Sequence, residues 1–497
     1  MTQKKLGVIL SYFNIIVNVA SNMIYTPFML KIIGQEEFGV YSLCISIVGY
    51  FSLLYMGMTS TYLRYFSRYK KQEKEKIFNL NGLFLVIFTG LGIISLAVGV
   101  VIAFNADWIF SSGLNSSETN LASHLFIILS INIFLLMPKT VFSVMALAYE
   151  KFVFINILNL AHSFFLPLLS VIVLFYGYRS IGMSFVVLVL TVFELIINYI
   201  YCRQYIKIGF DFRNLPFSIL PDMFSFSIFI MLQGLMDQVN WQLEKILLAT
   251  YKGSTSIAIY TIGVQINQLF MMLPAVFSGV VGPQIYQLIQ RKSTKDINDL
   301  WIKISRYQFY VVYFIFLAFV LWGRKFIELW LGIEFLNVYY VSLLLMGPII
   351  IHLCQSSVGS EVLRGYNKHK EWVTVTLFLS ILGFFISIPF IKKYGAIGAA
   401  VGNAIVSTLV ANIYTNWYYY KKVNFEVKKF FLNIFRLVPY SAVALFWGIL
   451  LNNNTYISCW GDFWKCILMY VCMYVFAVWV FGMNEEEKKI VRSFIKI

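Results

Sequence analysis

Long apolar stretches follow one another through almost the whole of this sequence. Fourteen of them can be delimited, at about 7–32, 38–62, 78–104, 121–147, 153–176, 180–201, 222–249, 255–285, 301–322, 337–360, 372–391, 396–418, 431–451 and 463–482. A helix needs about 20 mostly apolar residues to cross roughly 30 Å of hydrocarbon. Continuous apolarity favours helices, because the strands of a membrane barrel are short and alternate in polarity. The sequence therefore predicts an all-α integral membrane protein with about 14 transmembrane helices.

The composition agrees with the membrane class. Of the 497 residues, 60% are hydrophobic and only 12% are charged, whereas a soluble domain carries about 25% charged residues. The net charge of +16 does not indicate a nucleic-acid partner, because Lys and Arg occur in small clusters between apolar runs rather than in one basic domain. The six cysteines show no metal-binding spacing. Neither nucleic acid nor a metal site is predicted.

Lys and Arg are distributed unequally between the two sets of loops. If both termini are cytoplasmic, 27 of these residues lie on the cytoplasmic side, 7 lie on the opposite side, and 5 lie inside or at the ends of spans. The positive-inside rule therefore predicts cytoplasmic termini. The first apolar stretch is too long for a signal peptide and is interpreted as an uncleaved span. No loop is long enough for a soluble domain, so we expect the protein to act within the bilayer.

Glycine-containing turns recur along the chain. "IIGQEEFGVYSL" (32–43) and "YKGSTSIAIYTI" (251–262) match at five positions with a constant offset of 219 residues. Two further pairs of turns have similar offsets, namely 146–154 with 362–372 and 176–187 with 394–405. An even number of spans in each repeat gives parallel halves. The predicted organisation is an N-terminal lobe of spans 1–6 (1–215), a C-terminal lobe of spans 7–12 (216–425), and spans 13–14 with a cytoplasmic tail (426–497).

Five segments also carry a family resemblance. They are "LKIIGQEEFGVYSL", "YMGMTSTYLRYFSRYK", "ELWLG", "VLRGYNKHKE" and "YGAIGAAVGNAI", in that order. From about residue 7 to 418 the chain resembles bacterial polysaccharide-biosynthesis flippases, the Wzx-type translocators of the multidrug/oligosaccharidyl-lipid/polysaccharide exporter superfamily.

The resemblance implies two six-helix lobes around a central cleft in the bacterial cytoplasmic membrane. It also implies alternating access, with a polyprenyl-pyrophosphate-linked oligosaccharide flipped from the inner to the outer leaflet for O-antigen or capsule assembly. A polysaccharide polymerase and chain-length machinery are the implied partners, besides membrane lipids. No enzymatic activity and no bound cofactor are implied.

Two polar stripes lie in equivalent spans of the two repeats. Span 1 carries Asn14, Asn18, Ser21, Asn22 and Tyr25, whereas span 7 carries Gln233, Asp237, Asn240 and Glu244. Adding 219 to positions 14, 18, 21 and 25 gives 233, 237, 240 and 244. Lipid cannot solvate these groups, so they must face either a water-filled cavity or another helix. The symmetry of the stripes favours the cavity, and hydrogen bonding between helices is the alternative.

Acidic residues within spans are candidates for ion coupling. Asp237 lies near mid-membrane, where burial favours the neutral carboxyl group, so it is the first candidate to carry a proton or sodium ion from a transmembrane gradient. Glu194 is the second. Glu244 and Lys245 stand where relatives often carry an acid–base pair, which implies gating or cargo binding. A structural ion pair is the alternative for Asp237, and a local pair of Glu244 with Lys245 is the alternative for those two residues.

Basic residues near the cleft are candidates for binding pyrophosphate. Lys139 lies roughly 13 Å from the cytoplasmic end of its span at 1.5 Å per residue, near the limit of snorkelling. Arg64, at a position where relatives commonly carry Arg, and Arg306 lie closer to the cytoplasmic mouth. An Arg fork suits phosphate, and the alternative for both is an ordinary positive-inside residue.

Other classes of membrane protein are alternatives to a flippase. A multidrug antiporter or a peptidoglycan-precursor flippase of the same superfamily remains the alternative, although a drug exporter needs fewer basic groups in its cleft. A membrane polymerase or glycosyltransferase needs a large outer loop or an acidic metal-binding motif, and neither is found. An ATP-driven pump is excluded because the sequence lacks a GxxxxGK[ST] loop.

Overall fold

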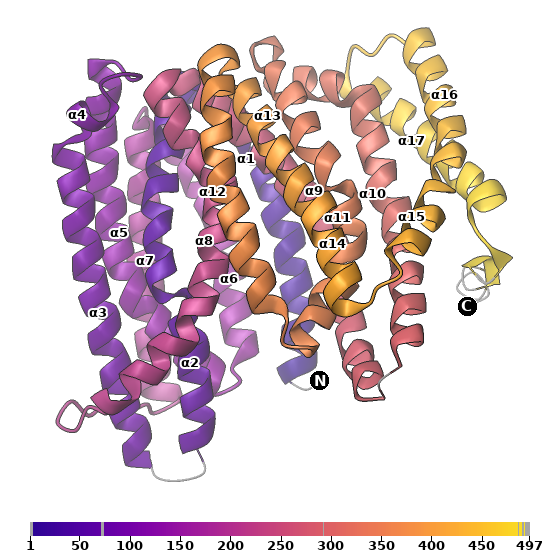
Figure 1. The fold of residues 1–497 in the computed structure, drawn as a ribbon. Helices are drawn as coiled ribbons and strands as arrows, with labels where there is room; N and C mark the ends of the chain where they lie inside the picture. Colours follow the sequence, from indigo (N-terminus) through magenta and orange to yellow (C-terminus); the bar gives the residue numbers. More distant parts are fainter. Residues whose placement is uncertain (1–2, 71–73, 292, 486, 490–491, 493–497) are drawn as a thin grey trace. The chain divides into compact units, whose positions relative to one another are not determined.

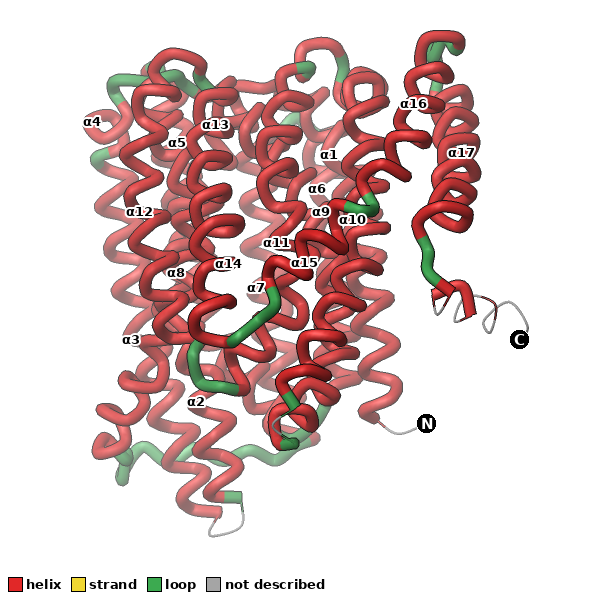
Figure 2. The backbone as a smooth tube through the Cα atoms, turned by 45° about the vertical axis from the view of Figure 1, so that its right-hand side comes forward, coloured by secondary structure: helices red, strands yellow, loops and turns green. Residues whose placement is uncertain are grey.

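The computed structural model describes residues 3–70, 74–291, 293–485, 487–489 and 492. Helices account for almost all of these residues, and none of them forms a strand (Figures 1 and 2). Eleven of the described helical segments are long and apolar enough to cross a membrane. The predicted all-α class is confirmed.

Contacts along the chain divide it into two compact units, Met1–Thr261 and Ile262–Ile497. The first unit contains α1 (Gln3–Gly49), η1 (Tyr50–Ser52), α2 (Leu53–Tyr69), α3 (Lys74–Phe104), α4 (Ala106–Phe110), α5 (Ser116–Ala148), α6 (Phe152–Phe175), α7 (Arg179–Ile200), η2 (Tyr201–Tyr205), η3 (Phe217–Ile219), α8 (Leu220–Tyr251) and the start of α9 (Ser254–Gln290). The lobe boundaries at 215/216 and 425/426 stay predictions.

The second unit contains the remainder of α9 and the C-terminal helices. These are α10 (Thr294–Leu331), η4 (Ile333–Phe335), α11 (Asn337–Gly365), α12 (His369–Tyr394), α13 (Ala396–Ser407), η5 (Thr408–Tyr414), α14 (Thr415–Tyr418), η6 (Tyr419–Val423), α15 (Val427–Phe435), α16 (Val438–Asn454), α17 (Trp460–Ala477) and η7 (Val478–Gly482). The hydroxyl of Tyr474 in α17 donates to the carbonyl of Tyr310 in α10 at 2.9 Å, which holds these two helices together.

Left-handed backbone positions recur at the spacing of the sequence repeat. Gly34 (φ 80°) and Gly253 (φ 86°) are 219 residues apart, and Gly177 and Gly395 are 218 apart. The pairs Glu150–Asn367 and Lys207–Asn424 are each 217 apart and have φ between 56° and 60°. Glycine adopts positive φ without steric cost, which is why the turns at 34 and 253 carry it. The four pairs give the backbone the same internal repeat as the sequence.

Within the first unit, α5 packs against α3 and α7, and α1 packs against α6. The start of α5 is fixed by a capping box, in which the side chain of Asn115 accepts from the backbone of Glu118 and the side chain of Glu118 accepts from the backbone of Asn115. Gly99 lets α3 approach α5, because a Cβ there would lie 1.8 Å from the Ser130 hydroxyl. This packing brings the polar residues of α5, α6 and α7 to one level.

Candidate functional site

Three charged or titratable side chains from neighbouring helices meet in the first unit. Lys139 of α5 forms an ion pair with one carboxylate oxygen of Glu194 of α7. The other oxygen of Glu194 lies 2.8 Å from Nδ1 of His162 of α6. Lys139 is nine residues before the end of α5, His162 ten after the start of α6 and Glu194 six before the end of α7. Because α5 and α7 run antiparallel to α6, these positions lie at a similar depth.

The carboxylate is the buried member of this Lys139–His162–Glu194 cluster. The Glu194 side chain is 9% exposed, whereas Lys139 and His162 are 20% and 34% exposed. Asn198, one turn further along α7, donates to the Glu194 carbonyl and accepts from Ser143 of α5. Both carboxylate oxygens therefore have a partner, and the two partners reach the surface of the unit. A proton on Glu194 would abolish the ion pair and leave the Lys139 ammonium group available to an anion.

The polar stripe of α1 faces α6 and then continues onto the surface of the unit. Ser163, next to His162 on α6, donates to Asn14 and accepts from Asn18, both at 3.4 Å. The amide of Asn22 donates to the carbonyl and side chain of Asn18. Asn18 and Asn22 are exposed and Asn14 is half-buried. The stripe thus bonds to a neighbouring helix through one edge and presents amides on the surface of the unit through the other, and its predicted place in a cavity stays a prediction.

The equivalent stripe on α8 is described only in part. The side chains of Gln233 and Asp237 lie outside the described residues, so the predicted coupling role of Asp237 stays a prediction. Asn240 is half-buried and Glu244 is buried. Their predicted roles also stay predictions.

Lys245 occupies a buried polar contact between α8 and the second half of α1. Its ammonium group donates to the hydroxyl of Ser46 at 3.1 Å, and that hydroxyl donates to Gln242 at 2.8 Å. Glu244 is close enough to interact with the Lys245 charge. With 6% exposure, Lys245 serves packing of α8 on α1 in this structure, and a cargo-binding role requires these helices to separate.

The two arginines predicted at the mouth have different surroundings. Arg64 is exposed near the end of α2, as a residue that meets a headgroup must be. Arg306 on α10 is instead engaged by the C-terminal segment: its guanidinium contacts both carboxylate oxygens of Glu487 at 2.7 and 3.0 Å. The same group donates to Tyr310 and to the carbonyl of Gly482. Its predicted phosphate role stays a prediction and would require this Arg306–Glu487 clamp to open.

Sequence reasoning missed His162 as a member of the cluster. It treated Lys139 and Glu194 separately, one as a phosphate ligand and the other as a coupling acid. A signal was present, because the three residues are nearly equidistant from the same ends of antiparallel spans. What the sequence does not contain is the rotation of each helix about its axis, which decides whether residues at one depth face each other.

Comparisons with known proteins identify the family and the fold. A sequence model of the family described as "Polysaccharide biosynthesis protein" matches residues 6–289. A putative O-antigen transporter of Shigella flexneri is 23% identical over 403 residues, which cover 79% of this chain and 92% of that protein.

Solved structures extend this likeness to the fold of almost the whole chain. The lipid II flippase MurJ in an inward closed conformation has a TM-score of 0.74 at 18% identity, covering 96% of this chain and 98% of that one. An inward-facing MATE-family multidrug transporter of the MOP superfamily has a TM-score of 0.63 at 15% identity, covering 83% and 99%. With these relatives and its apolar helices, the chain is a multi-pass membrane protein with a MurJ- and MATE-like fold. The predicted resemblance is confirmed, and the chain belongs to the polysaccharide biosynthesis protein family.

Proposed function

We propose that this protein is a secondary transporter that flips a polyprenyl-pyrophosphate-linked oligosaccharide from the inner to the outer leaflet of the bacterial cytoplasmic membrane, for surface polysaccharide assembly. The observation that carries the proposal is the Lys139–His162–Glu194 cluster beside the exposed amides of α1. A cation that can be released from its carboxylate, next to amide groups, suits a pyrophosphate joined to sugars. The O-antigen transporter and lipid II flippase among its relatives support the same substrate class.

The proposed topology has fourteen spans with both termini in the cytoplasm. Phe13–Tyr69 counts as one apolar segment but has 57 residues, enough for two crossings at about 20 residues each. The positive φ of Gly34 separates its two halves. α8 and α9, with 32 and 37 residues, supply two further spans. The asymmetry of Lys and Arg between the loops supports the orientation.

In the proposed mechanism, Lys139 exchanges one anion for another. While Glu194 is ionised, it holds the ammonium group of Lys139. A proton taken up by Glu194 on the cytoplasmic side removes the ion pair, so Lys139 binds the pyrophosphate of the cargo there. His162, hydrogen-bonded to the same carboxylate, orients it and offers a second proton acceptor. Loss of the proton to the other side restores the ion pair and releases the cargo.

The remaining predicted residues keep subsidiary roles in this proposal. Asn14, Asn18, Asn22, Gln233 and Asn240 hydrogen-bond the sugars. Asp237 and Glu244 are the equivalent coupling candidates on α8. Arg64, Lys245 and Arg306 meet the pyrophosphate where the lobes open, and the polymerase and chain-length machinery receive the flipped unit. The alternating-access cleft between two six-helix lobes belongs to the same proposal.

The first experiment is to deplete the protein in its own host and analyse its lipid-linked oligosaccharides. We expect complete repeat units to accumulate on the carrier in the cytoplasmic leaflet. An unchanged lipid pool in cells that become drug-sensitive would contradict the flippase and support the antiporter. Accumulation of peptidoglycan precursor instead would identify that lipid as the cargo.

A complementation series tests whether the Lys139–His162–Glu194 cluster takes part in transport, independently of whether the protein is a flippase. The double variant Lys139→Met/Glu194→Gln removes both charges together and leaves no uncompensated ion, so we expect it to fold. It should nevertheless fail to clear the accumulated pool. Arg179→Gln, which removes an exposed ion pair with Glu37 elsewhere in the unit, is the control and should clear it. If the double variant clears the pool normally, the cluster has no role in transport even though the protein is a flippase.

A further inference from the structure

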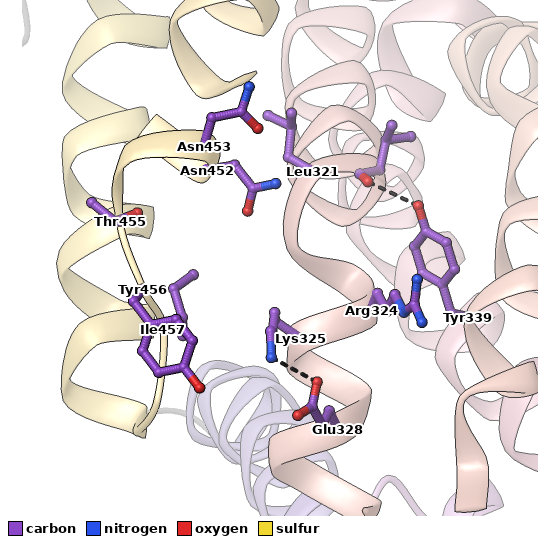
Figure 3. A pocket seen from close by; sticks show the side chains of 11 residues that line it. Leu321, Arg324, Lys325, Glu328, Tyr339, Asn452, Asn453, Thr455, Tyr456 and Ile457 are labelled. Carbon is purple, nitrogen blue, oxygen red and sulfur yellow. Dashed lines mark hydrogen bonds and ion pairs between the residues drawn. The ribbon is translucent and has the colours of Figure 1, made fainter. Parts of the chain in front are cut away.

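A polar cavity lies in the C-terminal unit, and none of the residues named in the transport proposal line it. Its volume is about 670 Å³, within the range of about 300–1,000 Å³ typical of small-ligand pockets. One wall belongs to α10 and α11, and the facing wall is formed by the end of α16 and the loop after it (Figure 3). Its polar lining residues are Arg324, Lys325, Glu328, Tyr339, Asn452, Asn453, Thr455 and Tyr456.

The charges in this α10–α16 pocket do not cancel. Lys325 and Glu328 form an ion pair of 2.8 Å, drawn as a dashed line in Figure 3. Arg324, by contrast, makes no hydrogen bond or ion pair with any residue that the structure describes. Two cations and one carboxylate leave a formal charge of +1. Arg324 has five N–H donors available, and Lys325 has two N–H donors beyond the one in its ion pair. Together with the net charge of +1, these donors favour an anion that carries a single negative charge.

Neutral donors complete the pocket on its other side. The side-chain amides of Asn452 and Asn453 and the hydroxyl of Tyr456 stand opposite Lys325 in Figure 3. Asn452 and Asn453 are exposed, and Tyr456 is 87% exposed. These groups can donate to phosphate oxygens while Glu328 accepts from a headgroup hydroxyl or amine. The lining therefore suits a phosphate that carries a polar substituent.

The position of the pocket indicates a membrane lipid as the source of that phosphate. Four helix ends meet there: α10 ends at Leu331, α11 starts at Asn337, α16 ends at Asn454 and α17 starts at Trp460. In a membrane protein such helix ends lie at headgroup depth, where Trp and Tyr are enriched. Tyr339 and Tyr456 line the pocket accordingly, and Trp330, Tyr340 and Trp460 lie at or near the ends of α10, α11 and α17.

The helices before and after the loop of the pocket, α16 and α17, also carry apolar surface. They expose large apolar side chains, including Phe446, Leu450, Trp464 and Leu468. An exposed apolar face next to a polar pocket at a helix end matches an amphiphile, whose chains lie along the helices while its headgroup enters the pocket.

We propose that the α10–α16 pocket is a binding site for the phosphodiester headgroup of a glycerophospholipid, with Arg324 as its principal ligand. A phosphodiester carries one negative charge, which matches the charge of the pocket. The monoester of a polyprenyl phosphate carrier is the other source of lipid phosphate at this depth, but its second charge faces Glu328. The proposal does not depend on which cargo the protein flips.

Native mass spectrometry of the delipidated full chain in detergent, titrated with phosphatidylglycerol, tests this site. Arg324→Gln should weaken phosphatidylglycerol binding about tenfold, the loss expected for one charge-assisted contact. Asn452→Leu keeps the charge of the pocket and should weaken phosphatidylglycerol binding by a smaller factor. This variant tests the site independently if Arg324→Gln fails to fold. Arg436→Gln is the matched control: this exposed arginine precedes α16, about 24 Å from Asn452 at 1.5 Å per residue, and should leave binding unchanged.

The sources are distinguished by repeating the titration with a polyprenyl phosphate. The wild-type chain should prefer phosphatidylglycerol, and Glu328→Gln, which raises the charge of the pocket to +2, should shift the preference towards the monoester. Stronger wild-type binding of the polyprenyl phosphate would overturn the phosphodiester assignment. Equal binding of phosphatidylglycerol by the Arg324→Gln, Arg436→Gln and wild-type chains would overturn the site itself.

Discussion

Two cation–carboxylate contacts, one in each unit, look alike in the sequence and differ in the structure. The Lys139–Glu194 pair joins two long helices, and Lys139 has one protein partner and three donors. The Arg306–Glu487 clamp joins α10 to the C-terminal segment, and its guanidinium also contacts Tyr310 and Gly482. Its two side chains are 11% and 3% exposed, against 20% and 9% for the first pair.

The two cations differ in how many protein groups hold them. What matters is how many of their donors the protein already uses. The Nε and Nη2 groups of Arg306 donate to a carboxylate, a hydroxyl and a carbonyl, so they stabilise one arrangement of the chain. Lys139 holds only a carboxylate that a proton could neutralise, so it can change partners. Substitutions at these ion pairs should therefore reduce the stability of the fold to different extents.

The largest effect is expected at Lys139. Lys139→Met leaves Glu194 buried without its ion pair, which should destabilise the fold by about 3–5 kcal/mol. Lys139→Met/Glu194→Gln also removes the charge of the Glu194 carboxylate and should recover most of the lost stability. Thermal unfolding of the purified chain in detergent measures both. If the double variant is no more stable than the single one, the pair is not the source of the destabilisation, and the comparison with the clamp fails.

A smaller effect is expected at the clamp. Arg306→Met leaves Glu487 without its guanidinium partner, so the loss should be about 1.5–3 kcal/mol, the range for a hydrogen bond to a charged group. Arg306→Lys keeps the charge but loses the bidentate contact and should fall between wild type and Met. Limited trypsin digestion gives a second measure, because Lys488 should be cleaved faster in the Met variant. Unchanged cleavage would show that the clamp does not hold the segment.

The smallest effect is expected for the ion pair of Arg179 and Glu37, because the Glu37 carboxylate, 13% exposed, keeps the backbone N–H and the hydroxyl of Ser180 as donors when the arginine is removed. The Arg179–Glu37 contact of 2.6 Å is short, but the Arg179 side chain is 55% exposed. Arg179→Gln should therefore cost less than about 1 kcal/mol, and that cost should shrink as salt is added. Unfolding temperatures at low and high salt test this. A loss as large as that of Lys139→Met would mean that exposure does not separate functional from peripheral ion pairs here.

The sequence was sufficient to predict the helical class, the repeat and two members of the cluster. Span length and turn glycines are local properties, so they could be read from neighbouring residues. Contacts between helices could not, since they depend on how each helix is rotated. This is why Glu194 was not assigned to Lys139, and why His162 was overlooked. Likewise, nothing in the acidic run at 485–487 indicates that Glu487 is buried against Arg306.

The recurring left-handed positions have a consequence for the history of the chain. At Glu150 and Asn367, and again at Lys207 and Asn424, both copies keep a positive φ although the side chains differ and neither is glycine. L-residues pay roughly 1–2 kcal/mol to adopt this conformation, so two independent origins at matching sites are improbable. The bends are older than the residues that now occupy them. The matching bends indicate that the two halves of the chain descend from one ancestral sequence that was duplicated and joined end to end.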